Sequence, residues 1–170
     1  MAFSSSPHHL GNPSTNFTKG KMTIPSKDLD IVWGGDDRYW TIPNDMNSAA
    51  HLHQVSWLEV TASVRGTNPS KNYDVGFRVS VTPDAFGWSN YPVYIMVKRG
   101  KEGKFAWKKF FLNTNETNKP FEITGRLIKA EKPLEDSSDD QRVYFGLYEV
   151  WSGKWKGGLK IHHAFITESP

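Results

Sequence analysis

Apolar residues recur at every second position in short segments along most of this chain, and turn residues separate the segments. This period of two is typical of half-buried β-strands, because successive side chains of a strand point to opposite faces of a sheet. No helical spacing of apolar residues competes with it. The pattern appears at residues 58–64, 75–81, 93–97, 105–111, 121–127, 143–147 and 159–165.

Clusters of Gly, Pro, Asn, Asp and Ser between these segments predict turns, for example at residues 66–69 and 89–92. Two further short strands are expected around residues 28–33 and 38–42, which brings the number to eight or nine. Two antiparallel sheets packed face to face bury one side of each strand, so an all-β, jelly-roll-like β-sandwich is predicted. A closed barrel would satisfy the same pattern.

The chain has 170 residues, which is sufficient for one core of ordinary size. Residues 1–25 are rich in Ser, His, Asn and Pro and predict a flexible N-terminal arm, while residues 26–170 form the predicted sandwich domain. No apolar run approaches the ~20 residues of a membrane span, so no membrane insertion is expected. The first residues lack a secretory signal pattern and the chain lacks cysteine, which favours a cytoplasmic protein.

Several of the seven tryptophans lie among turn residues and charges instead of within apolar runs. Indole faces beside carboxylates and amides suit sugars, because pyranose C–H bonds lie flat on an aromatic ring while hydroxyls need hydrogen-bond partners at its edge. We therefore expect a carbohydrate site built from these segments. The predicted carbohydrate-binding residues are Trp33, Asp36, Tyr39, Trp40, Trp88, Glu149, Trp151 and Trp155.

Other roles stay open for some of these residues. Glu149 continues the apolar face of residues 143–147, where an ionised carboxylate is costly, so it either reaches the rim of the sandwich or forms a salt bridge. Trp88 either extends the sugar groove or plugs the open end of the sandwich, and Trp155 either stacks on sugar or packs in a hairpin. Trp57 and Trp107 lie in predicted strands and are expected to pack in the core or in an interface.

Enzymatic and metal chemistry find little support in the sequence. The Gly-x-Ser-x-Gly turn of a serine hydrolase and the loops that cradle phosphate are both missing. Glu149 with Asp36 or Asp37 would supply the two carboxylates of a glycosidase, but binding without turnover is favoured, because a small sandwich rarely encloses a sugar. His51 and His53 share a strand face without an indicated third ligand, so neither a metal site nor a cofactor is predicted.

The formal net charge is +3, and the basic residues cluster at 98–104 and 108–109 opposite an acidic run at 135–140. Such runs are typical of solvated loops. A polyanion-binding surface is the alternative for the basic group.

The motifs Asp30-Ile-Val-Trp33, Arg38-Tyr-Trp40, Gly87-Trp88 and Glu149-Val-Trp151 occur in this order, with Val55-Ser-Trp57 and Tyr73-x-Val-x-Phe77 between them. Over residues 26–168 the chain resembles the phloem protein 2 superfamily of Nictaba-like plant lectins, most closely its small cucurbit lectins. The resemblance implies a lectin domain that binds N-acetylglucosamine oligomers of the chitin type and the chitobiose core of N-glycans. It further implies a homodimer in plant cytosol and phloem sap, with a role in plant defence.

In that family two tryptophans of the first segment and a glutamate near the C-terminus are associated with sugar binding, and by motif these are Trp33, Trp40 and Glu149. Two other functions stay open. An RNA-binding phloem transport protein would use the mild positive charge and exposed aromatic rings, and its affinity would fall steeply with salt. A structural component that docks on filaments would require a large apolar patch.

Overall fold

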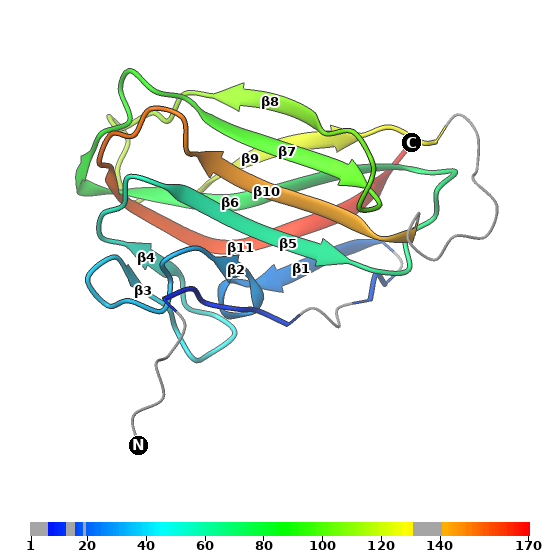
Figure 1. The fold of residues 1–170 in the computed structure, drawn as a ribbon, viewed down its shortest axis with the longest axis horizontal. Helices are drawn as coiled ribbons and strands as arrows, with labels where there is room; N and C mark the ends of the chain where they lie inside the picture. The colour runs from blue at the N-terminus through cyan, green and yellow to red at the C-terminus, as the bar shows by residue number, and fades with distance from the viewer. Residues whose placement is uncertain (1–6, 13–15, 19, 131–140) are drawn as a thin grey trace.

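The computed structural model describes residues 7–12, 16–18, 20–130 and 141–170. In Figure 1 the strands form two layers stacked face to face. The elements found in the described residues are β1 (Lys21–Pro25), the 3-10 helix η1 (Ser26–Asp28), β2 (Asp30–Ile31), β3 (Trp40–Thr41), β4 (Ala50–Leu52), β5 (Leu58–Val64), β6 (Asn72–Phe86), β7 (Val93–Arg99), β8 (Ala106–Phe110), β9 (Phe121–Leu127), β10 (Val143–Glu149) and β11 (Gly157–Ser169).

One layer is a six-stranded sheet in the order β3-β4-β11-β6-β9, in which β1 also pairs with β11. The other layer is a five-stranded sheet in the order β2-β5-β10-β7-β8. All of these pairings are antiparallel, so the predicted β-sandwich is confirmed. The two sheets share no strand among the described residues, which leaves the barrel alternative without support. β2 and β3 lie within the short strands expected around residues 28–33 and 38–42, while β1 and β4 bring the number of strands above the eight or nine predicted.

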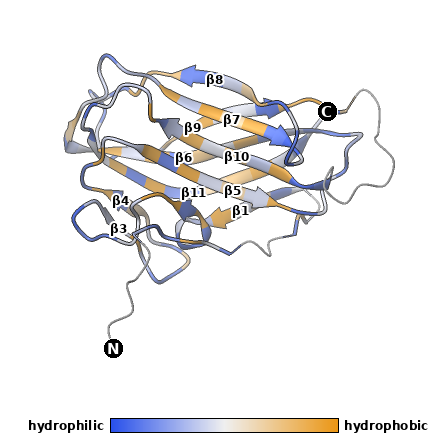
Figure 2. Cartoon of the chain, in the orientation of Figure 1, coloured by the Kyte–Doolittle hydropathy of each residue, from blue (hydrophilic) through white to orange (hydrophobic). Residues whose placement is uncertain are grey.

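The core lies between the layers and follows the predicted alternation. In β5 the residues Leu58, Val60, Ala62 and Val64 are buried, while the residues that alternate with them are half-buried. Phe77 of the six-stranded sheet and Phe145 of the five-stranded sheet meet across the core, with ring centroids 5.6 Å apart. Figure 2 shows the same alternation as apolar and polar colour along the strands.

The alternation misleads at β8, the edge strand of the five-stranded sheet. Trp107 is 63% exposed and lies opposite Met96, on the outer face of that sheet. An edge strand is covered on fewer sides than a central strand, so an aromatic residue there is not forced inward. The core packing expected for Trp107 is therefore wrong, as it is for Trp57, which precedes β5 and is 45% exposed; packing in an interface stays a prediction for both.

Parts of the predicted arm belong to the sandwich. Strand β1 pairs with β11 along its whole length. The backbone of His9 exchanges two hydrogen bonds with that of Ile31, at 2.9 and 2.8 Å. The predicted arm boundary is thus wrong for residues 7–12 and 21–25, whereas residues 1–6, 13–15 and 19 lie outside the described residues. Within the described part of the chain, no helix has the length and apolar character needed to cross a membrane.

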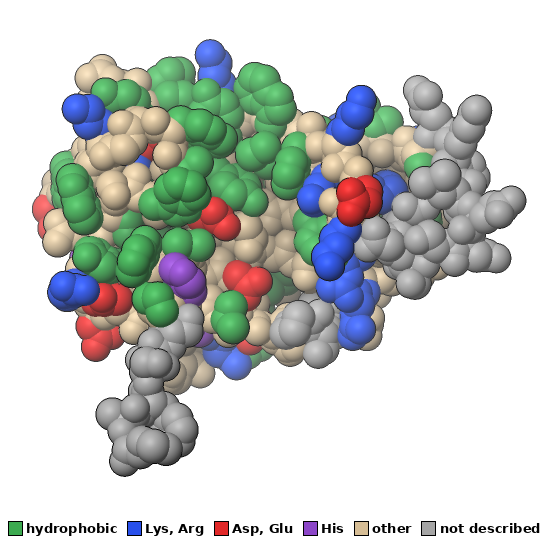
Figure 3. Space-filling model, viewed as in Figure 1, with side chains coloured by type: hydrophobic (Ala, Val, Ile, Leu, Met, Phe, Trp, Pro, Cys, Tyr) green, Lys and Arg blue, Asp and Glu red, His purple; other side chains and the backbone are tan. Residues whose placement is uncertain are grey.

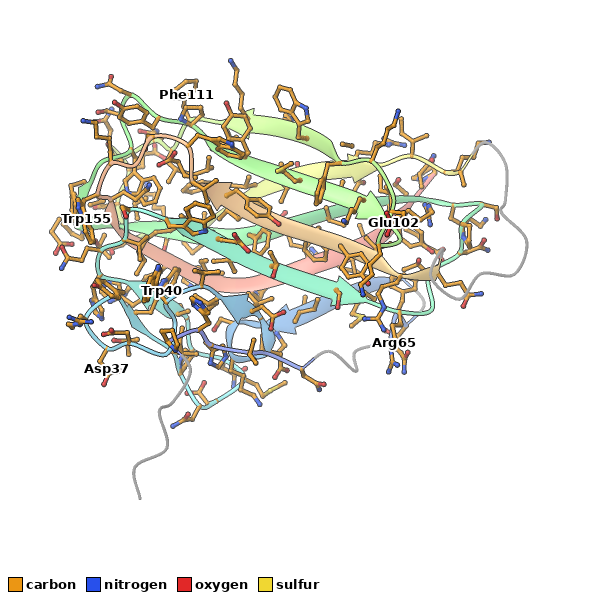
Figure 4. All side chains as sticks on the ribbon, in the orientation of Figure 1. Asp37, Trp40, Arg65, Glu102, Phe111 and Trp155 are labelled. Carbon is orange, nitrogen blue, oxygen red and sulfur yellow. The ribbon has the colours of Figure 1, made fainter. Side chains whose placement is uncertain are left out.

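The connections between strands gather at two ends of the sandwich. We call one end the aromatic end; it carries residues 32–39, 53–57, 87–92 and 150–156, and Trp40 and Trp155 are labelled there in Figure 4. The opposite end, the basic end, carries residues 65–71, 99–105 and 141–142, with Arg65 and Glu102 labelled in Figure 4. In Figure 3 hydrophobic side chains gather toward the aromatic end, while Lys and Arg side chains gather toward the basic end.

Candidate functional site

Trp33 stands at the aromatic end in an uncommon backbone conformation. Its φ of 66° lies in the left-handed region, which bulky residues rarely adopt, within a turn closed by the Gly34 N–H donating to the Ile31 carbonyl at 3.0 Å. The Trp33 N–H donates to Nδ1 of His8 at 3.0 Å, and the His8 ring meets the indole edge-on at 5.5 Å. Backbone strain of this kind costs about 1–3 kcal/mol and clusters at binding sites. The indole is 38% exposed, so the strained turn presents it to solvent.

Tyr39 and Trp155 complete a shallow cleft beside Trp33. The Tyr39 ring centroid is 5.7 Å from that of Trp33 and 6.2 Å from that of Trp155. These three rings, with Val55 and Ser56, line a pocket of about 100 Å³. Pockets that enclose a drug-sized ligand measure about 300–1,000 Å³, so this cleft has room for one side group of a sugar and not for its whole ring. The fold thus brings together three of the predicted site residues.

Asp36 lies in the same turn, and its carboxylate is engaged by Arg38. The Arg38 Nε donates to Oδ1 at 3.0 Å and Nη2 donates to Oδ2 at 2.7 Å. Hydrogen bonds from the side chain and backbone of Arg38 lower the pKa of Asp36. The Arg38 guanidinium also lies 5.1 Å from the centre of the Tyr39 ring. Asp36 therefore orders the turn that carries Tyr39, and its contact with a ligand stays a prediction.

Glu149, the last residue of β10, does not face solvent: its side chain is 4% exposed. Oε1 accepts from the Ser152 N–H at 3.1 Å, while Oε2 accepts from the Ser152 hydroxyl at 2.7 Å and from the ammonium of Lys156. Burial alone raises the pKa of the Glu149 carboxyl, but hydrogen bonds from Lys156 and Ser152 and the Lys156 charge outweigh it and hold that pKa below its ordinary value. The salt-bridge alternative is thus confirmed, and an exposed carboxylate at the rim is wrong, because the side chain still points inward where the strand ends.

Trp40 and Trp88 are each only 1% exposed. The Trp88 indole N–H donates to the Gly157 carbonyl at 2.8 Å, so this ring plugs the end of the sandwich. Among the described residues, the Trp40 indole nitrogen has no hydrogen-bond partner. The exposure expected for Trp40 is wrong, whereas for Trp88 the plug is confirmed over the groove alternative. Neither ring offers a face on which a sugar ring could stack in this structure.

Trp151 belongs to a second aromatic group. It is 60% exposed, and its ring meets Tyr94 edge-on at 4.8 Å. Tyr94 in turn lies 5.7 Å from Trp107 on the outer face of the five-stranded sheet. The structure therefore places Trp151 with this group and not against the cleft of Trp33, Tyr39 and Trp155.

Four residues of this region are missed by the sequence patterns. Val55 and Ser56 line the cleft, but in the sequence they contribute only to the motif Val55-Ser-Trp57 of the family resemblance and are not among the predicted site residues. His8, which supports Trp33, falls in the predicted arm. Lys156 had a detectable signal, because a carboxylate on an apolar strand face requires a nearby cation.

The basic end holds the larger hollow. Its volume is about 780 Å³, and it is lined by Asn16, Arg65, Gly66, Lys101, Gln141, Arg142 and Tyr144. Lys98 and Arg142 lie 5.6 and 5.9 Å from the centre of the Tyr144 ring. His51 and His53 are neighbours, with ring centroids 4.6 Å apart, but no group of three metal-binding side chains is found in the described part of the chain.

The chain is similar in sequence to one protein family and to individual plant proteins. The family model described as Phloem protein 2 matches residues 19–167. The protein PHLOEM PROTEIN 2-LIKE A9 of Arabidopsis thaliana is 40% identical over 181 aligned positions, which cover 99% of both chains. PHLOEM PROTEIN 2-LIKE A1 of the same plant is 30% identical, over 80% of this chain and 56% of that longer protein.

Among solved structures, part of an arabinose-bound α-L-arabinofuranosidase is similar, with a TM-score of 0.50 and 12% identity. The match covers 95% of this chain and 26% of that enzyme, and at such low identity it shows a shared fold alone. The sequence matches show more than the fold, because they extend over almost the whole sandwich and identify the family. The chain belongs to the phloem protein 2 family.

Proposed function

We propose that this chain is a non-enzymatic lectin that recognises oligomers of N-acetylglucosamine, such as chitooligosaccharides and the chitobiose core of N-glycans. The observation that carries the proposal is the cleft of Trp33, Tyr39 and Trp155 around a pocket of about 100 Å³. The strained backbone of Trp33 adds support, because it costs stability without contributing to the core. Membership of the phloem protein 2 family, together with the motifs shared with Nictaba-like lectins, points to the same ligand class.

The chemistry of the cleft suits an acetamido group, which has one N–H donor, one carbonyl acceptor and a methyl group. Aromatic walls and Val55 favour the methyl group, while the hydroxyls of Ser56 and Tyr39 supply hydrogen-bond partners for the amide. The pyranose ring then rests on the exposed face of Trp155, which is 51% exposed. Each stacked ring contributes about 1–3 kcal/mol, by analogy with bases stacked on aromatic side chains.

A site with so few contacts binds weakly, with a dissociation constant on the order of micromolar. Two copies in a homodimer would compensate on a clustered glycan, because the second binding event becomes intramolecular. We propose such a homodimer for the plant cytoplasm and phloem sap, in keeping with the phloem protein names of the relatives.

Isothermal titration calorimetry with chitotriose and with cellotriose tests the proposal, since the two sugars share a backbone and differ in the acetamido group. We expect binding of chitotriose only, weakened about tenfold or more by Trp33→Ala or Trp155→Ala. Trp107→Ala is the matched control, because it removes an indole that is more exposed than either cleft tryptophan and lies outside the cleft. Equal binding of both sugars would refute the acetamido pocket, and normal binding by both cleft variants would refute the site.

A nucleic acid is the second candidate ligand, and the hollow at the basic end favours it. Arg65, Lys101 and Arg142 surround that hollow beside Tyr144, which suits a phosphate backbone with one stacked base. Three phosphate contacts would make binding of single-stranded RNA about twentyfold weaker at 200 mM than at 50 mM salt, whereas sugar stacking would barely change. Arg142→Ala should weaken RNA binding and leave chitotriose binding intact. Salt-independent RNA binding would contradict this candidate.

A further inference from the structure

The ammonium of Lys156 joins three segments of the aromatic end. It donates to the Ser56 carbonyl at 2.9 Å, to the Glu149 carbonyl at 3.1 Å and to the Glu149 carboxylate. Its three N–H donors are therefore all used, in a side chain that is 1% exposed. The backbone of Lys156 also exchanges two hydrogen bonds with that of Val55, each of 2.9 Å.

Each of these three segments carries an exposed tryptophan close to the residue that takes part in the Lys156 hydrogen bonds. Trp57 follows Ser56, Trp151 lies within the turn that Ser152 closes onto the Glu149 carboxylate, and Trp155 precedes Lys156. These three indoles are between 45% and 60% exposed. The ion pair that is buried beneath them therefore sets the relative positions of the segments from which they project.

Stability alone is a poor explanation for this pair. Removing two charges from water costs several kcal/mol each, and apolar residues of similar volume are often as stable or more stable at such a position. What an apolar pair cannot supply is the set of directed contacts from Lys156 Nζ to the Ser56 and Glu149 carbonyls, and from Ser152 to the Glu149 carboxylate. The ion pair therefore fixes the relative positions of the three segments at the aromatic end.

We propose that Lys156 and Glu149 are positioning residues for the aromatic end: they hold Trp155 of the cleft, and Trp57 and Trp151 outside the cleft, in register without touching the ligand. The inference rests on the proposed lectin function only for its effect on affinity. It assigns to the glutamate of the C-terminal motif a role different from that of a sugar acceptor. It also brings in Lys156 and Ser152, and it makes Trp57 part of the presented surface.

The first experiment observes the tryptophans themselves and needs no ligand. Protein labelled with 5-fluorotryptophan gives one ¹⁹F resonance per indole, each assigned by a Trp→Phe substitution. Ser152→Ala removes only the hydroxyl that closes the turn onto Glu149 and leaves the ion pair in place. We expect it to shift or broaden the signal of Trp151 first, while the signals of Trp88 and Trp107 stay unchanged.

The second experiment separates positioning from stability. The double variant Glu149→Leu/Lys156→Met replaces the pair by apolar side chains of similar volume. We expect a urea midpoint at or above that of the wild type, displaced signals of Trp57, Trp151 and Trp155, and chitotriose affinity lowered about tenfold. Glu149→Gln alone should displace the same signals, because it weakens the contact to Lys156. If the ion pair served stability alone, the double variant would show a lower urea midpoint together with a lower chitotriose affinity.

The outcomes distinguish this inference from the lectin proposal. If the wild type binds no chitotriose, the lectin proposal fails, and the displaced ¹⁹F signals alone then decide whether the pair positions the indoles. Glu149→Gln with lost affinity and unchanged ¹⁹F signals would overturn the inference, because Glu149 would then contact the sugar directly. Wild-type affinity in the double variant would overturn it as well. Should the double variant fail to fold, wild-type signals and affinity in Ser152→Ala would also overturn the inference.

Discussion

The two ends of this sandwich are built by the same strands and yet present different kinds of surface. At the aromatic end, indoles project from turns that are fixed by a strained residue, by ring contacts and by a buried ion pair. At the basic end, long cationic side chains surround a wider hollow. Recognition of a neutral sugar depends on walls that are already in place, whereas attraction of a polyanion depends mainly on charge. The difference indicates that each end suits a different class of ligand.

Removing one cation from each end should give the largest contrast. Lys156→Met leaves Glu149 buried without a counter-ion, which should cost about 3–5 kcal/mol of unfolding free energy. Arg142→Met removes a more exposed cation at the basic end and should cost less than about 1 kcal/mol. Urea unfolding at pH 7 measures both values. Equal losses at the two ends would show that the ion pair has no special place in the fold.

Lowering the pH should reduce the difference in stability between the wild type and Lys156→Met. In the wild type the pKa of Glu149 is lowered, so the stability it provides is present above the ordinary glutamate pKa and is lost as the pH falls through the lowered value. In Lys156→Met only burial and the Ser152 contacts act on the carboxyl, so its protonation in acid removes the buried charge. The gap between the two urea midpoints should therefore shrink from pH 7 to pH 4, and a constant gap would contradict this account.

The strained turn at the aromatic end offers a test of function against stability. Trp33→Gly relieves the positive φ and should be about 1 kcal/mol more stable than Trp33→Ala, which keeps the strain. Both variants should lose about 1–3 kcal/mol of chitotriose binding, because the indole is absent in each. Thermal unfolding and calorimetry on the two proteins give the comparison. If the glycine variant were the less stable one, Trp33 would not be strained.

Substitution of the two buried indoles of the aromatic end should lower the unfolding free energy by different amounts, although this difference is smaller. Trp88→Phe leaves the Gly157 carbonyl without its indole donor, whereas Trp40→Phe removes an indole nitrogen that has no partner in the described residues. Both lose ring volume, so we expect Trp88→Phe to be more destabilising by about 1 kcal/mol. Urea midpoints of the two variants measure the difference, and an equal loss would show that the Trp88 hydrogen bond adds nothing.

The smallest expected effect concerns the outer face of the six-stranded sheet, between the two ends. Burial first, and then neighbouring positive charges, lower the pKa of His51, His162 and His163. The unfolded chain then binds protons more readily, so stability that is present above about pH 6.5 is lost as the pH falls through the lowered values. His51→Gln should flatten the slope of urea midpoint against pH between 7 and 5. An unchanged slope would remove His51 from the effect.

Much of the fold follows from local physics that the sequence displays. The alternation of β5, β6 and β10 gives the buried faces directly, because each strand has one side to bury and its period of two allows only one register. The alternation does not predict the exposed side of β8, since an edge strand is covered on fewer sides and can keep Trp107 outside. The pairing of residues 7–12 with β2 also escapes it, because the strength of that contact depends on backbone hydrogen bonds and not on side-chain pattern.

The candidate site is less visible in the sequence than the fold. Trp33, Tyr39 and Trp155 are found because indoles and phenols among turn residues are uncommon, and the turns bring them together. Trp40 and Trp88 have the same sequence surroundings and are buried, since burial at a sandwich end depends on how far neighbouring turns fold over it. Glu149 shows the same limit: its apolar register signals a buried carboxylate, but only the fold reveals Lys156 beside it.

Titration of the 5-fluorotryptophan protein with chitotriose shows which indoles of the folded chain the sugar contacts. We predict saturable shifts of the Trp33 and Trp155 signals, insensitive to salt, with the Trp107 signal unmoved. Saturable shifts confined to Trp107, or a spectrum unchanged at millimolar sugar, would contradict a sugar site at the aromatic end.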